Sequence, residues 1–320
     1  KVMKRIVVLG GLGLIGSHLC RRLVESGEEV ICVDIRDIEE SMMLFPYYRE
    51  GRLGYINHNV ISPLSIECDQ LYNLASPATF KHFDGHLVSM LRTNIVGSLN
   101  SLDLALRNRA SVVYASSGDV YGYATHTPCV ENELYSDNIT TYAESKRAAE
   151  AVCYAYRKEY DMQCSVARIF STYGSGSRAD DSRVVMRMIF DALSNRDIVI
   201  CGNGEQVRTF CWVGDVVDAL IRLMSLPSHL SPHTINIGSS REVSIRHLAE
   251  MIISLTSCRS RIVYSPPRRQ DPRRITPDLS LAYRLLDWPP TTSLSHGLQE
   301  TIEYARQYIA QLSSKRAVQI

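Results

Sequence analysis

The sequence lacks the features that mark a disulfide scaffold, a nucleic-acid binder or a membrane protein. Its nine cysteines are scattered and form no C-x-x-C pair, which argues against a disulfide framework and a zinc site, so we expect no metal and a reducing, cytoplasmic location. The 35 basic and 34 acidic side chains nearly cancel, so net charge favours neither nucleic acid nor an anionic membrane as a partner. No apolar run reaches about 18 residues, and the first residues lead directly into a strand, so we expect no signal peptide and no membrane span.

The hydrophobic pattern that is present predicts an α/β protein. Residues 5–34 show the pattern of a strand, a glycine-rich turn, a helix and a second strand. Apolar runs near 70–76, 111–117, 164–170 and 234–240 are typical of further buried parallel strands, and amphipathic helices are predicted over 94–106 and 142–160. The fold class is therefore a Rossmann-type doubly wound parallel sheet with a smaller C-terminal substrate-binding lobe.

The composition changes after residue 173 and predicts the domain boundaries. Residues 174–182 are rich in glycine, serine and charge, and residues 265–278 are rich in proline and arginine. Such segments are typical of loops that line a cleft. We predict a Rossmann domain over 1–173, to which 209–240 returns, a substrate-binding lobe from 174–208 and 241–314, and a tail over 315–320.

A dinucleotide-binding pattern follows the first strand. Gly10, Gly13 and Gly16 lie between that strand and its helix, where missing side chains let the backbone approach a pyrophosphate. Asp34 ends the second strand and is placed to accept both ribose hydroxyls, which favours NAD over NADP, although Arg36 weakens this inference. The other predicted cofactor contacts are Leu14 and Ile15, which begin the helix, and Asn59 and Val60, which either border the adenine or simply end a strand.

A second candidate constellation lies on the helix predicted over 142–160. Tyr142 and Lys146 are four residues apart, so both side chains project from one helix face. A tyrosine is a poor base at neutral pH, but a neighbouring ammonium favours the phenolate and can also hold a nicotinamide ribose. Such pairs also occur by chance. The chemical interpretation is favoured because Ser116 and Ser117 end a predicted strand and Asp119 follows them.

These motifs together resemble a known family. GGLGLIG (10–16), ASSGDVYG (115–122), YAESK (142–146) and RIFSTYG (168–174) are similar, in order and spacing, to the extended short-chain dehydrogenase/reductase family of nucleotide-sugar-modifying enzymes. Within that family, LYNLASPA (71–78), 142–156 and 183–193 look most like UDP-glucuronate decarboxylases. The resemblance covers essentially the whole chain.

The resemblance implies an NAD-dependent enzyme that acts through a transient 4-keto sugar. Tyr142 would take the proton from the sugar C4 hydroxyl, Lys146 would lower the pKa of Tyr142 and bind ribose, and Ser117 would hydrogen-bond the same oxygen. A 4-ketone beside a C5 carboxylate loses carbon dioxide readily, and Asp119 would handle the proton at C5 unless it is only a turn residue. We therefore expect UDP-glucuronate decarboxylation, with a UDP-sugar 4-epimerase and an NAD-binding protein without turnover as alternatives.

The expected substrate contacts lie later in the chain. Arg208 matches the family's nucleotide-binding arginine, and of the arginines at 268, 269, 273 and 274 we favour Arg273 for the diphosphate. Arg183 either reaches the same pocket or lies on the surface. Ser171 replaces the family's asparagine at a sugar-facing position, and Gly118 replaces the aspartate acid of the 4,6-dehydratases. The expected partners are a small nucleotide sugar and a second copy of the chain, with helix 142–160 supplying one homodimer surface.

Overall fold

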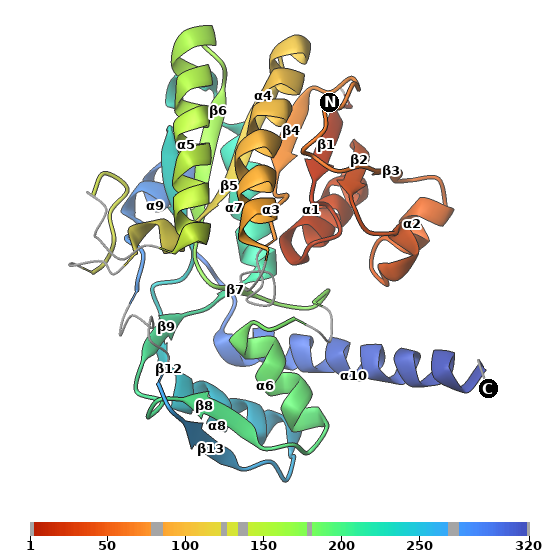
Figure 1. The fold of residues 1–320 in the computed structure, drawn as a ribbon, viewed down its shortest axis with the longest axis vertical. Helices are drawn as coiled ribbons and strands as arrows, with labels where there is room; N and C mark the ends of the chain where they lie inside the picture. The colour runs from red at the N-terminus through yellow and green to blue at the C-terminus, as the bar shows by residue number, and fades with distance from the viewer. Residues whose placement is uncertain are drawn as a thin grey trace.

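The centre of the molecule is a seven-stranded parallel sheet (Figure 1). The computed structural model describes residues 3–77, 86–122, 127–133, 140–177, 181–267 and 275–318. The strands of the sheet are β1 (Arg5–Leu9), β2 (Glu29–Asp34), β3 (Gly54–Asn57), β4 (Gln70–Asn73), β5 (Ser111–Ser117), β6 (Cys164–Ile169) and β11 (Thr234–Ile237). They lie in the order β11-β6-β5-β4-β1-β2-β3. From β1 the chain adds β2 and β3 on one side and then β4, β5, β6 and β11 on the other, which confirms the predicted doubly wound sheet.

Helices cover both faces of this sheet, as the apolar strands require. On one face lie α3 (Leu87–Leu91), the π-helical turn η3 (Arg92–Val96), α4 (Gly97–Asn108) and α5 (Thr141–Tyr160). Side chains of α4 and α5 form one core with alternate strand residues such as Val7 and Leu9, and α3 and η3 pack against α5. On the other face, α1 (Leu14–Glu25), α7 (Val213–Ser225) and α9 (Ser280–Leu286) pack against the intervening residues, such as Ile6 and Val8. Successive side chains of each strand point to opposite faces of the sheet, so they contribute alternately to two cores.

A smaller lobe lies beyond the carboxyl ends of the strands (Figure 1). Its core joins α6 (Val184–Leu193), β8 (Ile198–Cys201), α8 (Ile245–Thr256) and α10 (Leu294–Val318). Strand β13 (Ile262–Ser265) pairs in parallel with β8, and β9 (Val207–Thr209) pairs antiparallel with β12 (Glu242–Ser244). We call this unit, built from residues 184–210, 242–265 and 294–312, the small lobe.

The chain passes between the sheet and the small lobe several times. One passage is formed by β7 (Thr172–Tyr173) and β10 (Cys211–Trp212), which pair in parallel. We expected all of 241–314 to belong to the smaller unit, but Ala282 and Leu286 of α9 and the neighbouring Trp288 join the core between the sheet and α7. The Trp288 indole donates to the Asp215 carbonyl of α7 at 2.9 Å, so this segment is anchored on a helix that covers the sheet. The exact boundaries of the two units stay a prediction.

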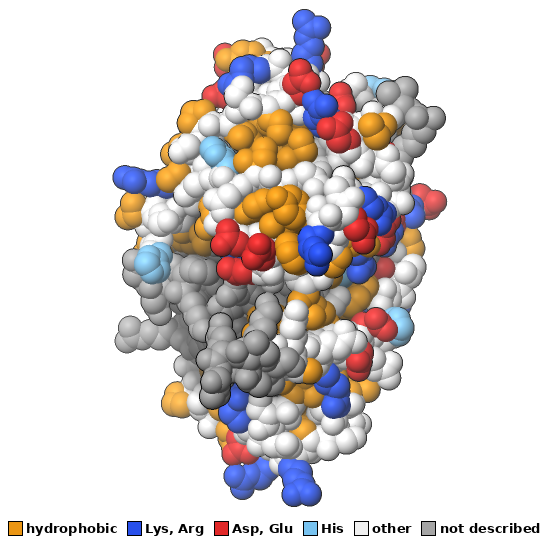
Figure 2. Space-filling model, turned by 90° about the vertical axis from the view of Figure 1, so that its right-hand side faces the viewer, with side chains coloured by type: hydrophobic (Ala, Val, Ile, Leu, Met, Phe, Trp, Pro, Cys, Tyr) orange, Lys and Arg blue, Asp and Glu red, His pale blue; other side chains and the backbone are white. Residues whose placement is uncertain are grey.

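Short elements complete the chain. They are η1 (Ile38–Glu40), α2 (Phe45–Arg49), η4 (Gly118–Tyr121) and η5 (Ser228–Leu230). Figure 2 shows the side of the molecule that faces right in Figure 1, where acidic and basic side chains are intermixed with hydrophobic ones. No helix among the described residues is both long and apolar enough to cross a membrane.

Candidate active site

The glycine-rich loop between β1 and α1 is built for close backbone contact. Gly10 has φ +75°, and a Cβ there would lie 2.8 Å from backbone atoms of Ala75. A Cβ on Gly16 would lie 2.3 Å from the carbonyl oxygen of Gly10, so α1 can begin against the loop only without a side chain at this position. Gly13 caps α1 in an extended conformation. The first amides of a twelve-residue helix therefore face the loop, which is the arrangement that binds a pyrophosphate.

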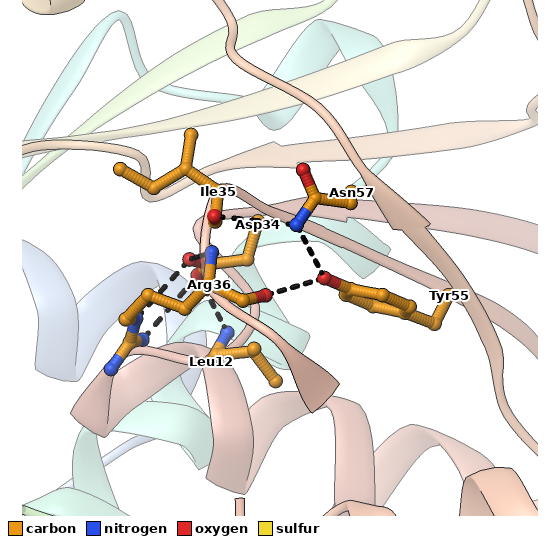
Figure 3. A network of polar contacts seen from close by, with 6 residues as sticks. All are labelled: Leu12, Asp34, Ile35, Arg36, Tyr55 and Asn57. Atoms are coloured by element: carbon orange, nitrogen blue, oxygen red, sulfur yellow. Dashed lines mark hydrogen bonds and ion pairs between the residues drawn. The ribbon is translucent and has the colours of Figure 1, made fainter. Parts of the chain in front are cut away.

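Asp34 ends β2 beside this loop and is nearly buried, at 8% exposure. Its Oδ2 accepts a hydrogen bond from the Leu12 amide at 2.9 Å, and its Oδ1 accepts from the Arg36 amide at 3.1 Å. The Arg36 guanidinium also contacts the carboxylate (Figure 3). The carboxylate is thus fixed at the edge of the loop where the ribose of a dinucleotide would lie.

The four other predicted cofactor contacts have different surroundings. Leu14 is buried and Ile15 is half-buried, and both belong to the core between α1 and the sheet. Asn59 is exposed, and its Oδ1 accepts a hydrogen bond from the Ile61 amide at 3.2 Å. Val60 is buried against Gly97 of α4, where a Cβ would lie 2.7 Å from Val60 Cγ2. The Val60 side chain therefore serves packing, and contact of these residues with the cofactor stays a prediction.

Ser117, Asp119 and Tyr142 meet at the carboxyl end of β5. The Ser117 hydroxyl accepts a hydrogen bond from the Asp119 amide at 3.1 Å and caps η4. Asp119 is exposed to solvent on one side, and the rest of its side chain is surrounded by protein. This burial raises the pKa of Asp119, while Ser117 and the charge of Arg208 oppose the rise.

Tyr142 lies at the start of α5 and is 9% exposed. Burial, followed by the charge of Asp119, raises the pKa of its phenol well above the ordinary value, whereas Ser117, Ser76 and Arg183 act to lower it. The net direction is opposite to the lowered pKa expected from the Lys146 ammonium. The reason is that Tyr142 is desolvated by the surrounding protein and faces an acidic side chain.

Lys146 lies one turn further along α5 and is buried. Its Nζ donates to the Ala115 carbonyl at 2.8 Å and lies 5.9 Å from the centre of the Tyr142 ring. Burial lowers the pKa of Lys146 to about 7, and the charge of Glu150 opposes this change. The ammonium is therefore held beside the tyrosine in an environment where it can lose its proton near neutral pH.

The predicted substrate contacts lie on both sides of the gap between sheet and small lobe. Arg183 precedes α6, forms an ion pair with Asp181, and is close enough to Tyr142 to affect its pKa. Arg208 lies on β9 and affects Asp119 in the same way. Arg208 of the small lobe is thus brought to the aspartate, and Arg183, which immediately precedes α6, is brought to the tyrosine.

Two further predicted residues do not join this cluster by any described contact. Ser171 lies between β6 and β7 with its side chain exposed, and its carbonyl accepts a hydrogen bond from the Cys211 amide at 2.9 Å. Arg273, with the other arginines at 268, 269 and 274, lies outside the described residues.

A buried polar network beneath the site was not predicted from the sequence. The guanidinium of Arg168 on β6 contacts both carboxylate oxygens of Glu150, at 3.0 and 2.8 Å, and Ser116 donates to Glu150 at 2.5 Å. Glu150 lies one turn after Lys146 on α5. The i,i+4 spacing of Lys146 and Glu150 was the available signal, whereas the approach of Arg168 depends on the pairing of β5 with β6.

Asn94 is a second buried polar residue that the sequence analysis missed. It lies within the π-helical turn η3, and its Nδ2 donates to the Ser145 hydroxyl at 2.7 Å. Its Oδ1 is buried without a hydrogen-bond partner. No local sequence pattern indicates the π-helical turn, because one extra residue in a helix leaves the hydrophobic period nearly unchanged.

The glycine loop, the carboxylate after β2 and the tyrosine–lysine helix define a dinucleotide-dependent enzyme. The model of the NAD dependent epimerase/dehydratase family matches residues 6–238, and the chain belongs to this family. It is 39% identical to UDP-glucuronic acid decarboxylase 1 of Danio rerio over 310 residues, which cover 95% of this chain and 73% of that protein. It is 34% identical to UDP-glucuronic acid decarboxylase 4 of Arabidopsis thaliana over 311 residues, which cover 95% of this chain and 69% of that protein.

Solved structures agree with this assignment. MoeE5 in complex with UDP-glucuronic acid and NAD is 30% identical to this chain, with a TM-score of 0.83. The superposition covers 95% of this chain and 99% of that chain. The cofactor of the family is NAD, and the residues of this chain fit it: Gly10 and Gly16 leave the space that a Cβ would fill, α1 presents its first amides, and Asp34 lies at the ribose edge.

Proposed function

We propose that this enzyme is a UDP-glucuronate decarboxylase that acts through a 4-keto sugar. The observation that carries the proposal is the meeting of Ser117, Asp119 and Tyr142 at the end of β5, with Arg208 of the small lobe close to the aspartate. The identity of 34% and 39% to relatives named as UDP-glucuronic acid decarboxylases, over 95% of this chain, supports the same substrate.

The reaction divides among the residues of the site as follows. Tyr142 accepts the proton of the C4 hydroxyl, and Ser117 hydrogen-bonds the same oxygen. Bound NAD would supply the acceptor for the C4 hydride and the later return of that hydride. The C5–C6 bond then breaks, carbon dioxide leaves, and the electron pair stays on the sugar as the enolate of the 4-ketone. A proton is next delivered to C5. Asp119 suits that delivery, because its carboxyl group lies beside Ser117 and Tyr142 and burial raises its pKa.

The ionisation of Tyr142 needs positive charge from its surroundings. Burial and Asp119 hold the phenol protonated, while Arg183 and Ser117 act in the opposite direction. Lys146 contributes in its charged form, and its pKa of about 7 ties that form to pH. In the proposed roles Lys146 also holds the nicotinamide ribose, and Ser171, Arg183, Arg208 and Arg273 hold the sugar and the diphosphate.

Product analysis tests this proposal. The protein is incubated with NAD and UDP-glucuronate, and the sugar nucleotide is analysed by chromatography and mass spectrometry. We expect loss of carbon dioxide without net NADH. An unchanged mass with a new retention time would instead identify a 4-epimerase, and no change with Tyr142 intact would support a binding protein without turnover.

A pair of variants tests the role of Asp119. Asp119→Asn should slow decarboxylation by roughly a hundredfold or more, because it removes the acid, while Asp119→Glu restores a carboxyl group. Tyr142→Phe serves as the inactive reference. Full activity of Asp119→Asn would show that Asp119 is only a turn residue.

We also propose that the chain forms a homodimer through α4 and α5. The outer faces of the helices on that side of the sheet expose large apolar side chains, of which Leu99 is 38%, Tyr154 51% and Tyr160 48% exposed. Ala149 of α5 lies on the opposite face of the helix and is buried against the sheet. Light scattering of the wild type and of Leu99→Lys/Tyr154→Lys tests the proposal; equal masses of a single chain in both would contradict it.

We propose a cytoplasmic location because of the state of the cysteines. All nine cysteines are free, and seven of them are buried, as expected of a protein kept in a reducing compartment. Fractionation of cells that make the protein, with a cytoplasmic marker enzyme as reference, tests this location.

A further inference from the structure

We propose that Arg36 is a specificity-determining residue of the cofactor site, which competes with the adenosine ribose for Asp34 and lets the protein accept NADP as well as NAD. The proposal concerns the dinucleotide site alone, so it does not depend on the reaction proposed above. It starts from the hydrogen bonds of one carboxylate (Figure 3).

The Asp34 carboxylate is already fully used. A carboxylate offers about four acceptor positions. The Leu12 and Arg36 amides take one on each oxygen, at 2.9 and 3.1 Å. The Arg36 side chain takes the others: its Nε lies 3.2 Å from Oδ1 and its Nη2 lies 3.4 Å from Oδ2. A ribose that presents two hydroxyls to Asp34 must therefore displace existing bonds.

The guanidinium is the group that can leave. Its two bonds are the longest of the four, and its side chain is 31% exposed, compared with 7% for that of Asp34. The Arg36 backbone, in contrast, is fixed, because the Tyr55 hydroxyl donates to the Arg36 carbonyl. Asn57 Nδ2 holds the Ile35 carbonyl at 3.3 Å and the Tyr55 hydroxyl at 3.1 Å. The ribose thus replaces the guanidinium, while the two backbone amides keep the carboxylate in place.

A displaced Arg36 remains tethered two residues beyond Asp34, at the ribose edge of the site. A 2′-phosphate at that edge would be repelled by a bare carboxylate, but the forked donors of a guanidinium bind phosphate well. Asp34 therefore favours the free hydroxyls of NAD, and Arg36 favours the phosphate of NADP. Because Asp34 and Arg36 both face the 2′ position of the ribose, the site should discriminate only weakly between NAD and NADP.

Binding measurements test this inference without any sugar substrate. Protein freed of bound nucleotide is titrated with NAD and with NADP by calorimetry, for the wild type, Arg36→Ala, Arg36→Lys and Tyr55→Phe. We expect Arg36→Ala to weaken NADP binding by about tenfold or more and to leave NAD binding equal or tighter. Arg36→Lys should keep part of the NADP affinity. Tyr55→Phe loosens the same backbone without changing charge, so it should change both affinities by the same factor.

Two results would overturn the inference. One is an Arg36→Ala variant whose ratio of NADP to NAD dissociation constants stays within about twofold of the wild type. The other is a wild type that binds NAD but shows no NADP binding up to about a thousand times the NAD dissociation constant. A protein that binds both cofactors as expected but releases no carbon dioxide from UDP-glucuronate would contradict the proposed reaction and leave this inference standing.

Discussion

The buried pair of Glu150 and Arg168 carries a strong prediction for stability. The side chains are 7% and 4% exposed, and their closest atoms are 2.8 Å apart. Burial alone would lower the pKa of Arg168, but the hydrogen bonds and charge of Glu150 outweigh it and hold that pKa above its ordinary value. Glu150→Gln removes the buried anion that faces this guanidinium, and breaking a buried ion pair by removing one partner costs about 3–5 kcal/mol. That is a large share of a total stability of about 5–15 kcal/mol.

Urea denaturation of four proteins measures this cost and separates it from packing. They are the wild type, Glu150→Gln, Arg168→Met and the double variant Glu150→Met/Arg168→Met. Each single variant should lose about 3–5 kcal/mol, and the double variant should lose clearly less than the sum, because both charges of the pair are then replaced by apolar side chains. A Glu150→Gln variant within about 1 kcal/mol of the wild type, or strictly additive losses, would refute the reasoning.

Three further predictions concern the cofactor loop and two buried bases. Gly16→Ala places a Cβ 2.3 Å from the Gly10 carbonyl oxygen, so the thermal stabilisation that NAD gives the wild type should vanish; an unchanged shift would contradict the close approach. Burial lowers the pKa of His18 from 6.5 to about 4. The unfolded chain binds the extra proton in that window, so stability should fall from pH 6.5 to 4, and urea midpoints of His18→Gln should fall less. Burial likewise lowers the pKa of Lys146 from 10.5 to about 7, so wild-type stability should rise with pH across that window. Lys146→Met should lack this rise, and equal slopes in the two proteins would show that Lys146 is not desolvated.

The parts of the fold that depend on local sequence could be predicted. The glycines from Gly10 to Gly16 determine the turn by their lack of a Cβ, and the period of two in the strands separates the two cores. The family, the parallel sheet and NAD as cofactor are confirmed. The helix expected over 142–160 is observed over Thr141–Tyr160, with the Thr140 hydroxyl as its N-cap.

The parts that depend on distant partners could not be predicted. The ion pair of Arg168 with Glu150 needs the register of β5 against β6, and the pairing of Arg36 with Asp34 depends on side-chain rotamers. The pKa of Tyr142 differs in direction from the expectation because desolvation is a property of the folded surroundings. The roles of the individual site residues stay predictions.

The returning strand β11 has a consequence for how the protein is made. Strand β11 pairs with β6, yet residues 170–233, which include the first segment of the small lobe, lie between them in the chain. During synthesis the N-terminal strands emerge first, and β6 then presents an unpaired edge until residue 237 has left the ribosome. A nascent chain stalled within residues 170–233 would therefore carry an open sheet edge that can pair with other chains. Aggregation of the nascent protein should be greatest over this interval and should cease once β11 has been added.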